Sequence, residues 1–342
     1  MFKIDRCYFC GVCLSRCHYL DFDLEKGEEE FTKLINREKV DWLHECITCM
    51  ACNEYCPTGA RPFDLILARL EEDGGFTDPA LVDEMKDRFE AKQEPRPVAV
   101  KGRAVSLCVM NGTAPWAFQG QLFEETTIIK GLPYFCNVMF VHMGNESIMR
   151  SRLQNMVDNL ARTGAEEIIF VHEDCYALLT DMASEYGIKT PFRPVHLFEY
   201  LRDYLREHST SINKLNMKVA YQRPCASRYT PPEVGDILND VFDMIGVIRV
   251  NRKYDYSNAL CCGAEEGGPN KKLFPRGRKF EPFREKNIKD ARDRGAEAMA
   301  YLCPMCFKSL NTDVRASGMK NYLISDLCRL ALGEELPPDK PA

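Results

Sequence analysis

Residues 293–306 read DRGAEAMAYLCPMC and residues 162–175 read RTGAEEIIFVHEDC, so the two stretches align at a constant offset of 131 residues. In each stretch a helical pattern ends at a glycine, a short apolar run follows, and a Cys-x2-Cys or His-x2-Cys pair closes the segment. Helices alternating with strands indicate mainly parallel sheets covered by helices. Open α/β sheets place their sites at the carboxyl ends of the strands. The repeat therefore predicts two duplicated α/β halves, each with one candidate site.

The texture of the chain changes near residue 98. Beyond that point short apolar runs at 104–109, 168–171, 219–221 and 247–250 alternate with helical patterns. Before it, a charged and glycine-rich stretch, an amphipathic segment at 79–92 and two prolines indicate an ordered connector. We predict a domain at residues 1–70, a linker with a helix at 71–97, a first α/β half at 98–212 and a second at 213–342.

Two runs of cysteines lie near the N-terminus, each with the spacing Cys-x2-Cys-x2-Cys-x3-Cys. Three cysteines at this spacing can hold one cubane cluster from a single loop, while the fourth points toward a second cluster. The runs therefore predict an α-helical, ferredoxin-like domain with two 4Fe–4S cubane clusters. The expected ligands are Cys7, Cys10, Cys13 and Cys56 for one cluster, and Cys46, Cys49, Cys52 and Cys17 for the other. Zinc sites are the alternative, but they use paired Cys-x2-Cys knuckles and not three in a row.

The second α/β half carries a set of five cysteines. They are Cys225, Cys261, Cys262, Cys303 and Cys306. Soft thiolate ligands suit iron–sulfur clusters, and a zinc ion with one spare cysteine is the alternative, although zinc usually stops at four ligands. The adjacent pair Cys261-Cys262 cannot bind one iron comfortably, so we expect one of the two to bridge irons or to be held in reserve. Chemistry is therefore expected at Cys261 and Cys262.

The first α/β half retains three of the five thiols. Cys108 matches Cys225, Phe135-Cys136 matches Cys261-Cys262, and His172 with Cys175 matches Cys303 with Cys306. The set Cys108, Cys136, His172 and Cys175 suits a zinc ion or a cubane with one histidine ligand. A vestigial site with a buried histidine is the remaining alternative. His196 lies in an apolar helical context and is expected to be a core histidine.

The cysteine spacing of the second half, with Gly263 directly after Cys262, resembles the CCG domain. This domain occurs in the catalytic subunit of heterodisulfide reductase and in the iron–sulfur subunits of glycolate and lactate oxidation systems. With the ferredoxin-like domain in front, the chain resembles a fusion of the small and catalytic heterodisulfide reductase subunits. The resemblance implies a non-cubane 4Fe–4S cluster on the five thiols of the second half. The chain departs from the family pattern in its first half, and in a longer last gap that contains Lys271, Lys272, Arg276 and Arg278.

The composition limits the classes of function. With 45 basic and 51 acidic residues the net charge is −6, which favours neither nucleic-acid binding nor membrane insertion. No apolar run approaches the roughly 18 residues of a membrane span, and no secretion signal is visible before the first cysteine. Thiols in a chain of this size fit a reducing compartment better than a disulfide framework. We expect a cytoplasmic protein.

These patterns together predict an oxidoreductase subunit. We expect the electron-transferring iron–sulfur subunit of a heterodisulfide-reductase-like complex from an anaerobe. It would pass electrons between a flavoprotein partner and the non-cubane site, where a small thiol, a disulfide or another acceptor reacts. The chain has no GxGxxG or P-loop fingerprint, so flavin chemistry is expected on another subunit. The alternatives are the iron–sulfur subunit of a glycolate- or lactate-type oxidase, and a non-catalytic adaptor with a structural zinc site.

Overall fold

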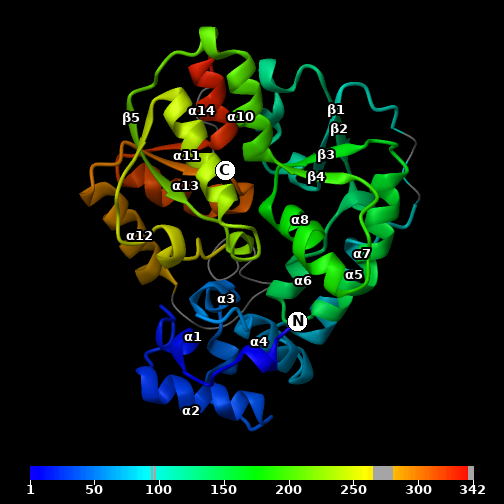
Figure 1. Ribbon diagram of the computed structural model, residues 1–342, viewed down its shortest axis with the longest axis vertical. Helices are drawn as coiled ribbons and strands as arrows, with labels where there is room; N and C mark the ends of the chain where they lie inside the picture. The colour runs from blue at the N-terminus through cyan, green and yellow to red at the C-terminus, as the bar shows by residue number, and fades with distance from the viewer. Residues whose placement is uncertain (94, 96–97, 265–279, 338–342) are drawn as a thin grey trace. The chain divides into compact units, whose positions relative to one another are not determined.

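The computed structural model describes residues 1–93, 95, 98–264 and 280–337 (Figure 1). The chain forms two compact units. The first, called the two-cluster unit, comprises Met1–Glu90, Asn137–Leu153 and Phe280. The second, called the sheet unit, comprises Ala91–Cys136, Gln154–Ala264 and the described residues from Glu281 onward.

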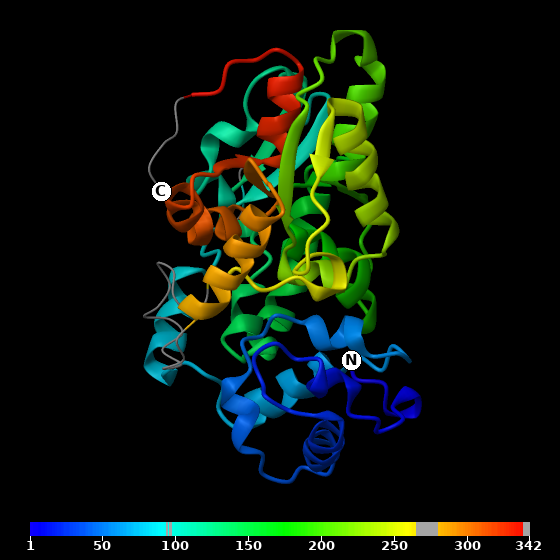
Figure 2. The same ribbon diagram turned by 90° about the vertical axis from the view of Figure 1, so that its left-hand side faces the viewer.

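The two-cluster unit is helical. Its helices are α1 (Val12–Ser15), α2 (Leu24–Ile35), α3 (Ala51–Tyr55), α4 (Pro62–Glu72), α5 (Pro79–Arg88), α6 (Met139–His142) and the start of α7 (Glu146–Ala161). Helix α2, which Figure 2 shows end-on, begins at Asp23, whose carboxylate accepts a hydrogen bond from the Lys26 backbone N–H at 2.8 Å. Such a side chain satisfies one of the free N–H groups of the first helical turn. Phe31 and Leu34 of α2 pack on Leu70 of α4 in one apolar core.

The sheet unit contains two four-stranded parallel sheets. The first has the order β2-β1-β3-β4 and the second β6-β5-β7-β8. The strands are β1 (Arg103–Cys108), β2 (Thr126–Lys130), β3 (Glu167–Phe170), β4 (Arg193–His196), β5 (Met217–Gln222), β6 (Val247–Arg249), β7 (Ala298–Tyr301) and β8 (Lys320–Leu323). The helices are the rest of α7, α8 (Glu173–Ala177), α9 (Ala183–Glu185), α10 (Leu197–Glu207), α11 (Glu233–Ile245), α12 (Glu281–Asp293), α13 (Pro304–Ala316) and α14 (Ile324–Ala331).

Short single turns connect these elements. The 3₁₀ turns are η1 (Ile4–Arg6), η2 (Asp41–Glu45), η3 (Met110–Gly112), η4 (Pro115–Phe118), η5 (Gln121–Phe123), η6 (Leu132–Tyr134), η8 (Ser209–Ser211), η9 (Cys225–Arg228) and η10 (Tyr256–Asn258), and η7 (Leu178–Met182) is a π turn. The predicted fold class is confirmed: an α-helical N-terminal domain precedes two α/β halves with parallel sheets.

The two halves repeat each other in detail. The register of the sheets pairs Ser106 of β1 with Phe170, and Gln222 of β5 with Tyr301, so Ser106 and Gln222 occupy equivalent places. His172 and Cys303 are both the N-cap residue of the helix that follows the third strand, α8 or α13. The duplication seen in the sequence is therefore a duplication of structure.

Helices from both halves join in one core of the sheet unit. In α11, Val234, Leu238, Val241 and Ile245 are buried on one face, and Gly246 ends the helix with φ of 69°. Glycine adopts this left-handed conformation without the Cβ penalty of other residues. Helix α11 packs against α10 of the first half and against α14, as Figure 1 shows.

Two further observations bear on the class of protein. All seventeen cysteines are free thiols. In the part of the chain that the structure describes, no helix is both long enough and apolar enough to cross a membrane.

Candidate metal centres

The two cysteine runs fold into loops with the same backbone. Phe9 and Thr48, at equivalent positions, both have φ of 55°, and Gly11 and Met50 have φ of 67° and 63°. A short helix, α1 or α3, follows each loop. Residues with positive φ turn successive backbone N–H groups toward one side, where they can bind an anion such as a cluster sulfur. The Thr48 N–H accordingly donates to Cys46 Sγ at 3.4 Å, and the Ala60 N–H donates to Cys56 Sγ at 3.3 Å.

The electrostatic neighbours of two buried thiols show which cysteines lie together. Burial raises the pKa of the Cys13 thiol, and three neighbouring thiols raise it further. These neighbours are Cys56, Cys7 and Cys10. Burial likewise raises the pKa of Cys52, followed by repulsion from Cys46, Cys49, Cys13 and Cys17. The fold thus brings the fourth cysteine of each run to the first three of the other run, which is the arrangement that two crossed cubane clusters need.

A histidine that the sequence did not single out holds the second loop. Thr48 is fully buried, and its hydroxyl donates to the Ile47 carbonyl at 2.7 Å. Because this bond uses the hydroxyl proton, His142 Nδ1, 2.9 Å from Thr48 Oγ1, must be the donor in that contact. His142 ends α6, about ninety residues along the chain from the loop, so no local pattern could have linked the two.

In the sheet unit, all candidate ligands follow the carboxyl ends of three adjacent strands in each half. Cys108 ends β1, Cys136 follows η6 after β2, and His172 follows β3. In the second half Cys225 follows β5, the pair Cys261-Cys262 follows β6 and η10, and Cys303 follows β7. This is the edge of the sheet where parallel α/β folds bind ligands.

The first-half residues predicted to bind a metal lie together. Cys175 is hydrogen-bonded to Cys108 and Cys136, and all three thiols are buried. The hydrogen bond from Cys175 lowers the pKa of Cys136 to about 6, against burial, which raises it, and with help from His172. Among the described residues, however, no group of three or more His, Cys, Asp or Glu side chains is arranged to hold a single metal ion.

The five thiols of the second half form a connected set. Cys225 Sγ lies 3.7 Å from Cys261 Sγ, Cys262 is hydrogen-bonded to Cys261 and to Cys306, and Cys306 is hydrogen-bonded to Cys303. The Gly263 N–H donates to Cys261 Sγ at 3.4 Å. Ligands of a cluster bind different irons, so five thiols around one space fit a cluster better than a single ion.

His172 connects the two sets, which the sequence treated as separate. Its Nε2 lies 3.1 Å from Cys303 Sγ of the second half, and its ring is also hydrogen-bonded to Cys136 of the first. Burial lowers the pKa of His172, but the charges of Asp174 and Cys303 and the bond to Cys136 raise it well above its ordinary value. In Cys303, a hydrogen bond from Cys306 and the nearby His172 lower the pKa to about 5 against the effect of burial. The thiols of both halves therefore belong to one continuous network.

A buried polar scaffold fixes the loops of the second half. Gln222 donates to the Leu260 carbonyl at 2.9 Å and accepts from Asn287 at 2.7 Å. Arg252 donates to Asn287 Oδ1 at 2.7 Å and to the Tyr221 carbonyl. Ser309 donates to the Cys262 carbonyl at 2.9 Å. These contacts hold the loop of Cys261 and Cys262 against β5, α12 and α13.

Other predicted features have clear outcomes. His196 is a buried core histidine, as predicted: it accepts from the Phe198 N–H at Nδ1, so its Nε2 carries the proton toward Glu173, 2.9 Å away. The four basic residues of the longer last gap lie outside the described residues. The apolar face of α7 is confirmed, with Met149, Leu153 and Leu160 buried.

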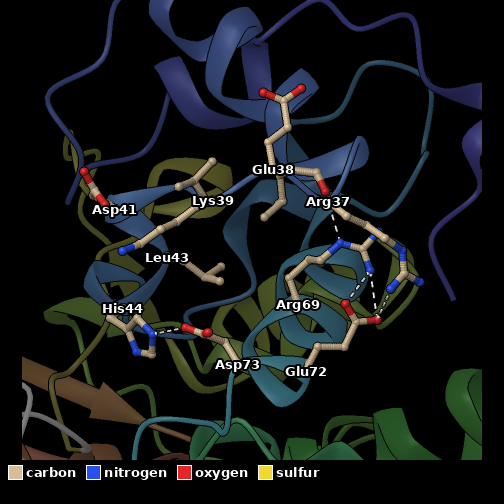
Figure 3. A pocket seen from close by; sticks show the side chains of 11 residues that line it. Arg37, Glu38, Lys39, Asp41, Leu43, His44, Arg69, Glu72 and Asp73 are labelled. Atoms are coloured by element: carbon tan, nitrogen blue, oxygen red, sulfur yellow. Dashed lines mark hydrogen bonds and ion pairs between the residues drawn. The ribbon is translucent and has the colours of Figure 1, made fainter.

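The two-cluster unit also contains a pocket of about 640 Å³ between α2, η2 and α4 (Figure 3). Its charged side chains pair with one another: Glu72 accepts from Arg69 at 3.0 Å and pairs with Arg37 at 3.2 Å, and His44 pairs with Asp73. Since these charges satisfy each other, the pocket offers an incoming ion little, and the chemistry of the chain lies with its cysteines.

Comparison with known proteins agrees with this geometry. Residues 3–60 match the family described as 4Fe-4S dicluster domain, and residues 219–311 match the cysteine-rich domain family CCG. One subunit of dihydromethanophenazine:CoB--CoM heterodisulfide reductase from Methanosarcina barkeri is 21% identical over 397 aligned residues, which cover 96% of this chain and 93% of that protein. The corresponding subunit of the same enzyme from Methanosarcina acetivorans is 22% identical over 375 residues, which cover 91% and 89%.

A solved structure of a hypothetical protein from Helicobacter pylori is similar in fold. It is 12% identical, with a TM-score of 0.57, and the match covers 90% of this chain but only 66% of that one. The chain is an iron–sulfur protein that joins a dicluster domain to a cysteine-rich domain. It is a CCG-domain iron–sulfur protein of the heterodisulfide reductase type, and iron–sulfur clusters are its cofactors.

Proposed function

We propose that this protein is the electron-transferring subunit of a heterodisulfide-reductase-like complex, passing electrons between a flavoprotein partner and a non-cubane 4Fe–4S site via two cubane clusters. The single observation that supports this most is the meeting of five thiols at the carboxyl edge of the second sheet. The similarity to two heterodisulfide reductase subunits over nearly the whole chain supports the same class of reaction.

Each group of thiols has a role in this proposal. Two crossed sets of four hold the cubanes, and the five thiols of the second half hold the non-cubane cluster. These clusters supply one-electron redox chemistry when bound. In the first half Cys108, Cys136 and Cys175, with or without His172, hold a zinc ion or a further cluster.

Cys261 and Cys262 are the residues at which we place the terminal chemistry. Five thiols exceed what a closed four-ligand centre requires, so one of the pair can yield its place when an acceptor approaches, as catalytic metal sites keep an open position. For a small disulfide acceptor, the S–S bond breaks, two electrons arrive from the flavoprotein by way of this chain, and two protons complete two thiols. The buried network of Gln222, Asn287 and Ser309 keeps the loop of this pair in place during the exchange.

Anaerobic purification with metal analysis tests the proposal. Three 4Fe–4S clusters predict about twelve irons and about twelve sulfides per chain, and a flavoprotein should co-purify. Zinc with little iron in the sheet unit would favour the non-catalytic adaptor. A co-purified flavin-dependent 2-hydroxy-acid oxidase would favour the glycolate- or lactate-type system.

A further inference from the structure

The two cysteine loops share one backbone but differ in how they are covered. Tyr8 and Phe9 of the first loop are equivalent to Ile47 and Thr48 of the second. Tyr8 is 75% exposed and Phe9 39%, whereas Ile47 is 3% and Thr48 0% exposed. Such a contrast between repeated loops indicates that one has a cover that the other lacks.

The cover of the second loop is part of the same unit. His142 at the end of α6 donates to Thr48 Oγ1 at 2.9 Å, and both side chains are buried. The segment Asn137–Leu153, which contains α6, thus closes this loop from outside the cysteine runs. The chain itself therefore shields the cluster ligands Cys46 and Cys49 on this side.

The first loop presents an apolar surface beside two predicted ligands. Ile4, Tyr8 and Phe9, called the first-loop patch, are all exposed, and Cys7 and Cys10 flank the two aromatic residues. Single exposed apolar residues are ordinary, but several together mark an interaction site. Aromatic side chains of this kind are the residues that contribute most to protein–protein interfaces.

The charges around the first-loop patch indicate what kind of surface fits it. Asp5 and Arg6, both exposed in η1, balance each other, so the patch is close to neutral. A complementary partner surface is therefore apolar with little net charge. A protein placed on the patch would contact the loop of Cys7 and Cys10 directly, which is useful to a partner that exchanges electrons.

We propose that the first-loop patch is the docking surface of the flavoprotein electron donor, with an apolar, nearly neutral contact face. The inference rests on the proposed function and makes it specific: electrons enter at the cluster of Cys7, Cys10, Cys13 and Cys56, and not at the shielded cluster of the second loop. The donor's cover on Tyr8 and Phe9 corresponds to that of α6 on Thr48.

Reduction kinetics test this with the full chain carrying its clusters. The probe is reduced flavodoxin, a small flavoprotein, mixed anaerobically with wild type and with the double variant Tyr8→Ser/Phe9→Ser. One electron leaves the reduced flavin, which is oxidised, and enters the chain, which is reduced. We expect the second-order rate constant to fall about tenfold or more, because loss of an interface aromatic commonly weakens binding by at least that factor. The control variant Ile248→Ser/Tyr256→Ser removes two comparably exposed apolar side chains and should keep the wild-type rate.

Dithionite, a small reductant that needs no docking surface, separates this inference from the proposed function. Dithionite should reduce both variants and wild type equally, with unchanged iron content. Failure to reduce wild type would contradict the proposed function itself. Equal flavodoxin rates in the double variant and wild type, or no reduction of wild type by flavodoxin, would overturn the docking surface alone.

Two other occupants of the patch are outcomes of the same experiment. Hydroxyl-radical footprinting that finds Tyr8 and Phe9 protected in the monomeric chain would show that the chain covers them itself. Sedimentation that finds a dimer, converted to monomer by the double substitution, would assign the patch to a second copy. Either result overturns the proposal.

Discussion

The carboxyl edges of the two sheets have the same strands in the same order but different interiors. At the end of the central strand the second half has Gln222, bonded to Leu260 and Asn287, while the first half has Ser106, a buried hydroxyl with no hydrogen-bond partner. The repeat places Met156 where the second half has Asn287. The half that has all five thiols thus has a polar scaffold for its loops, and the half with three has an apolar one. A complete site needs loops held in place as much as it needs ligands.

The sharpest way to break this comparison is to remove one thiol from each half. Cys262→Ala should abolish electron delivery to the terminal acceptor, because it removes the pair that we propose reacts, while the two cubanes stay reducible by the donor. Cys136→Ala, the equivalent change in the first half, should leave substantial delivery. Acceptor reduction and cubane spectra, measured side by side, check both variants. Full turnover in Cys262→Ala and in Cys261→Ala would refute the catalytic interpretation.

A second comparison concerns the crossed cysteine runs. Cys17→Ser should damage the cluster of Cys46, Cys49 and Cys52, because the fourth cysteine of each run lies with the other set. Electron paramagnetic resonance of the reduced variant should show loss of one of the two cubane signals. Cys56→Ser is the matched variant and should damage the cluster of the first run. Loss confined to the cluster of the run that carries the substitution would contradict the topology.

The polar scaffold can be tested without touching a ligand. Asn287→Ala leaves Gln222 Oε1 and the guanidinium of Arg252 without their partner, and we expect the free energy of unfolding to fall by about 3 kcal/mol, since buried polar groups without a bond are costly. Ser106→Ala in the first half should be neutral or slightly stabilising, because its hydroxyl has no partner to lose. Chemical denaturation of the two variants provides the measurement. Equal destabilisation of both would show that the scaffold is not specific to the complete half.

Much of the fold could be predicted from the sequence because the duplication is visible in it. Glycine, apolar strand and ligand pair recur at one offset, and they recur in space as helix end, strand and N-cap. The crossed cysteine sets also follow from spacing alone. What spacing cannot show is contact between distant segments. His142 reaches Thr48 from another part of the chain, and His172, matched in the repeat to a ligand, points its Nε2 at Cys303 of the other half. Nor does any pattern in residues 137–153 indicate that they join the two-cluster unit.

The smallest expected effect concerns a carboxylate near the end of each sheet. Asp326 in α14 and Glu199 in α10 occupy the same place after the fourth strand, but Glu199 pairs with Arg193 at 2.7 Å in a partly exposed setting, whereas Asp326 is buried. Burial raises the pKa of Asp326 to about 6, although a bond from the Leu323 N–H and the charge of Arg329 oppose the shift. A carboxyl with a raised folded pKa favours folding below its unfolded pKa of about 4 and loses this contribution as the pH rises through about 6. At pH 7 the buried charge therefore destabilises the fold. Asp326→Asn removes that charge, keeps an acceptor for the Leu323 N–H, and should raise the free energy of unfolding at pH 7 by up to about 2 kcal/mol, with the gain vanishing near pH 4. Glu199→Gln should show no such gain at pH 7, because its charge is paired at the surface. Denaturation curves of both variants at pH 7 and pH 4 decide the matter, and a gain for Asp326→Asn that is equal at the two pH values would show that packing and not charge is responsible.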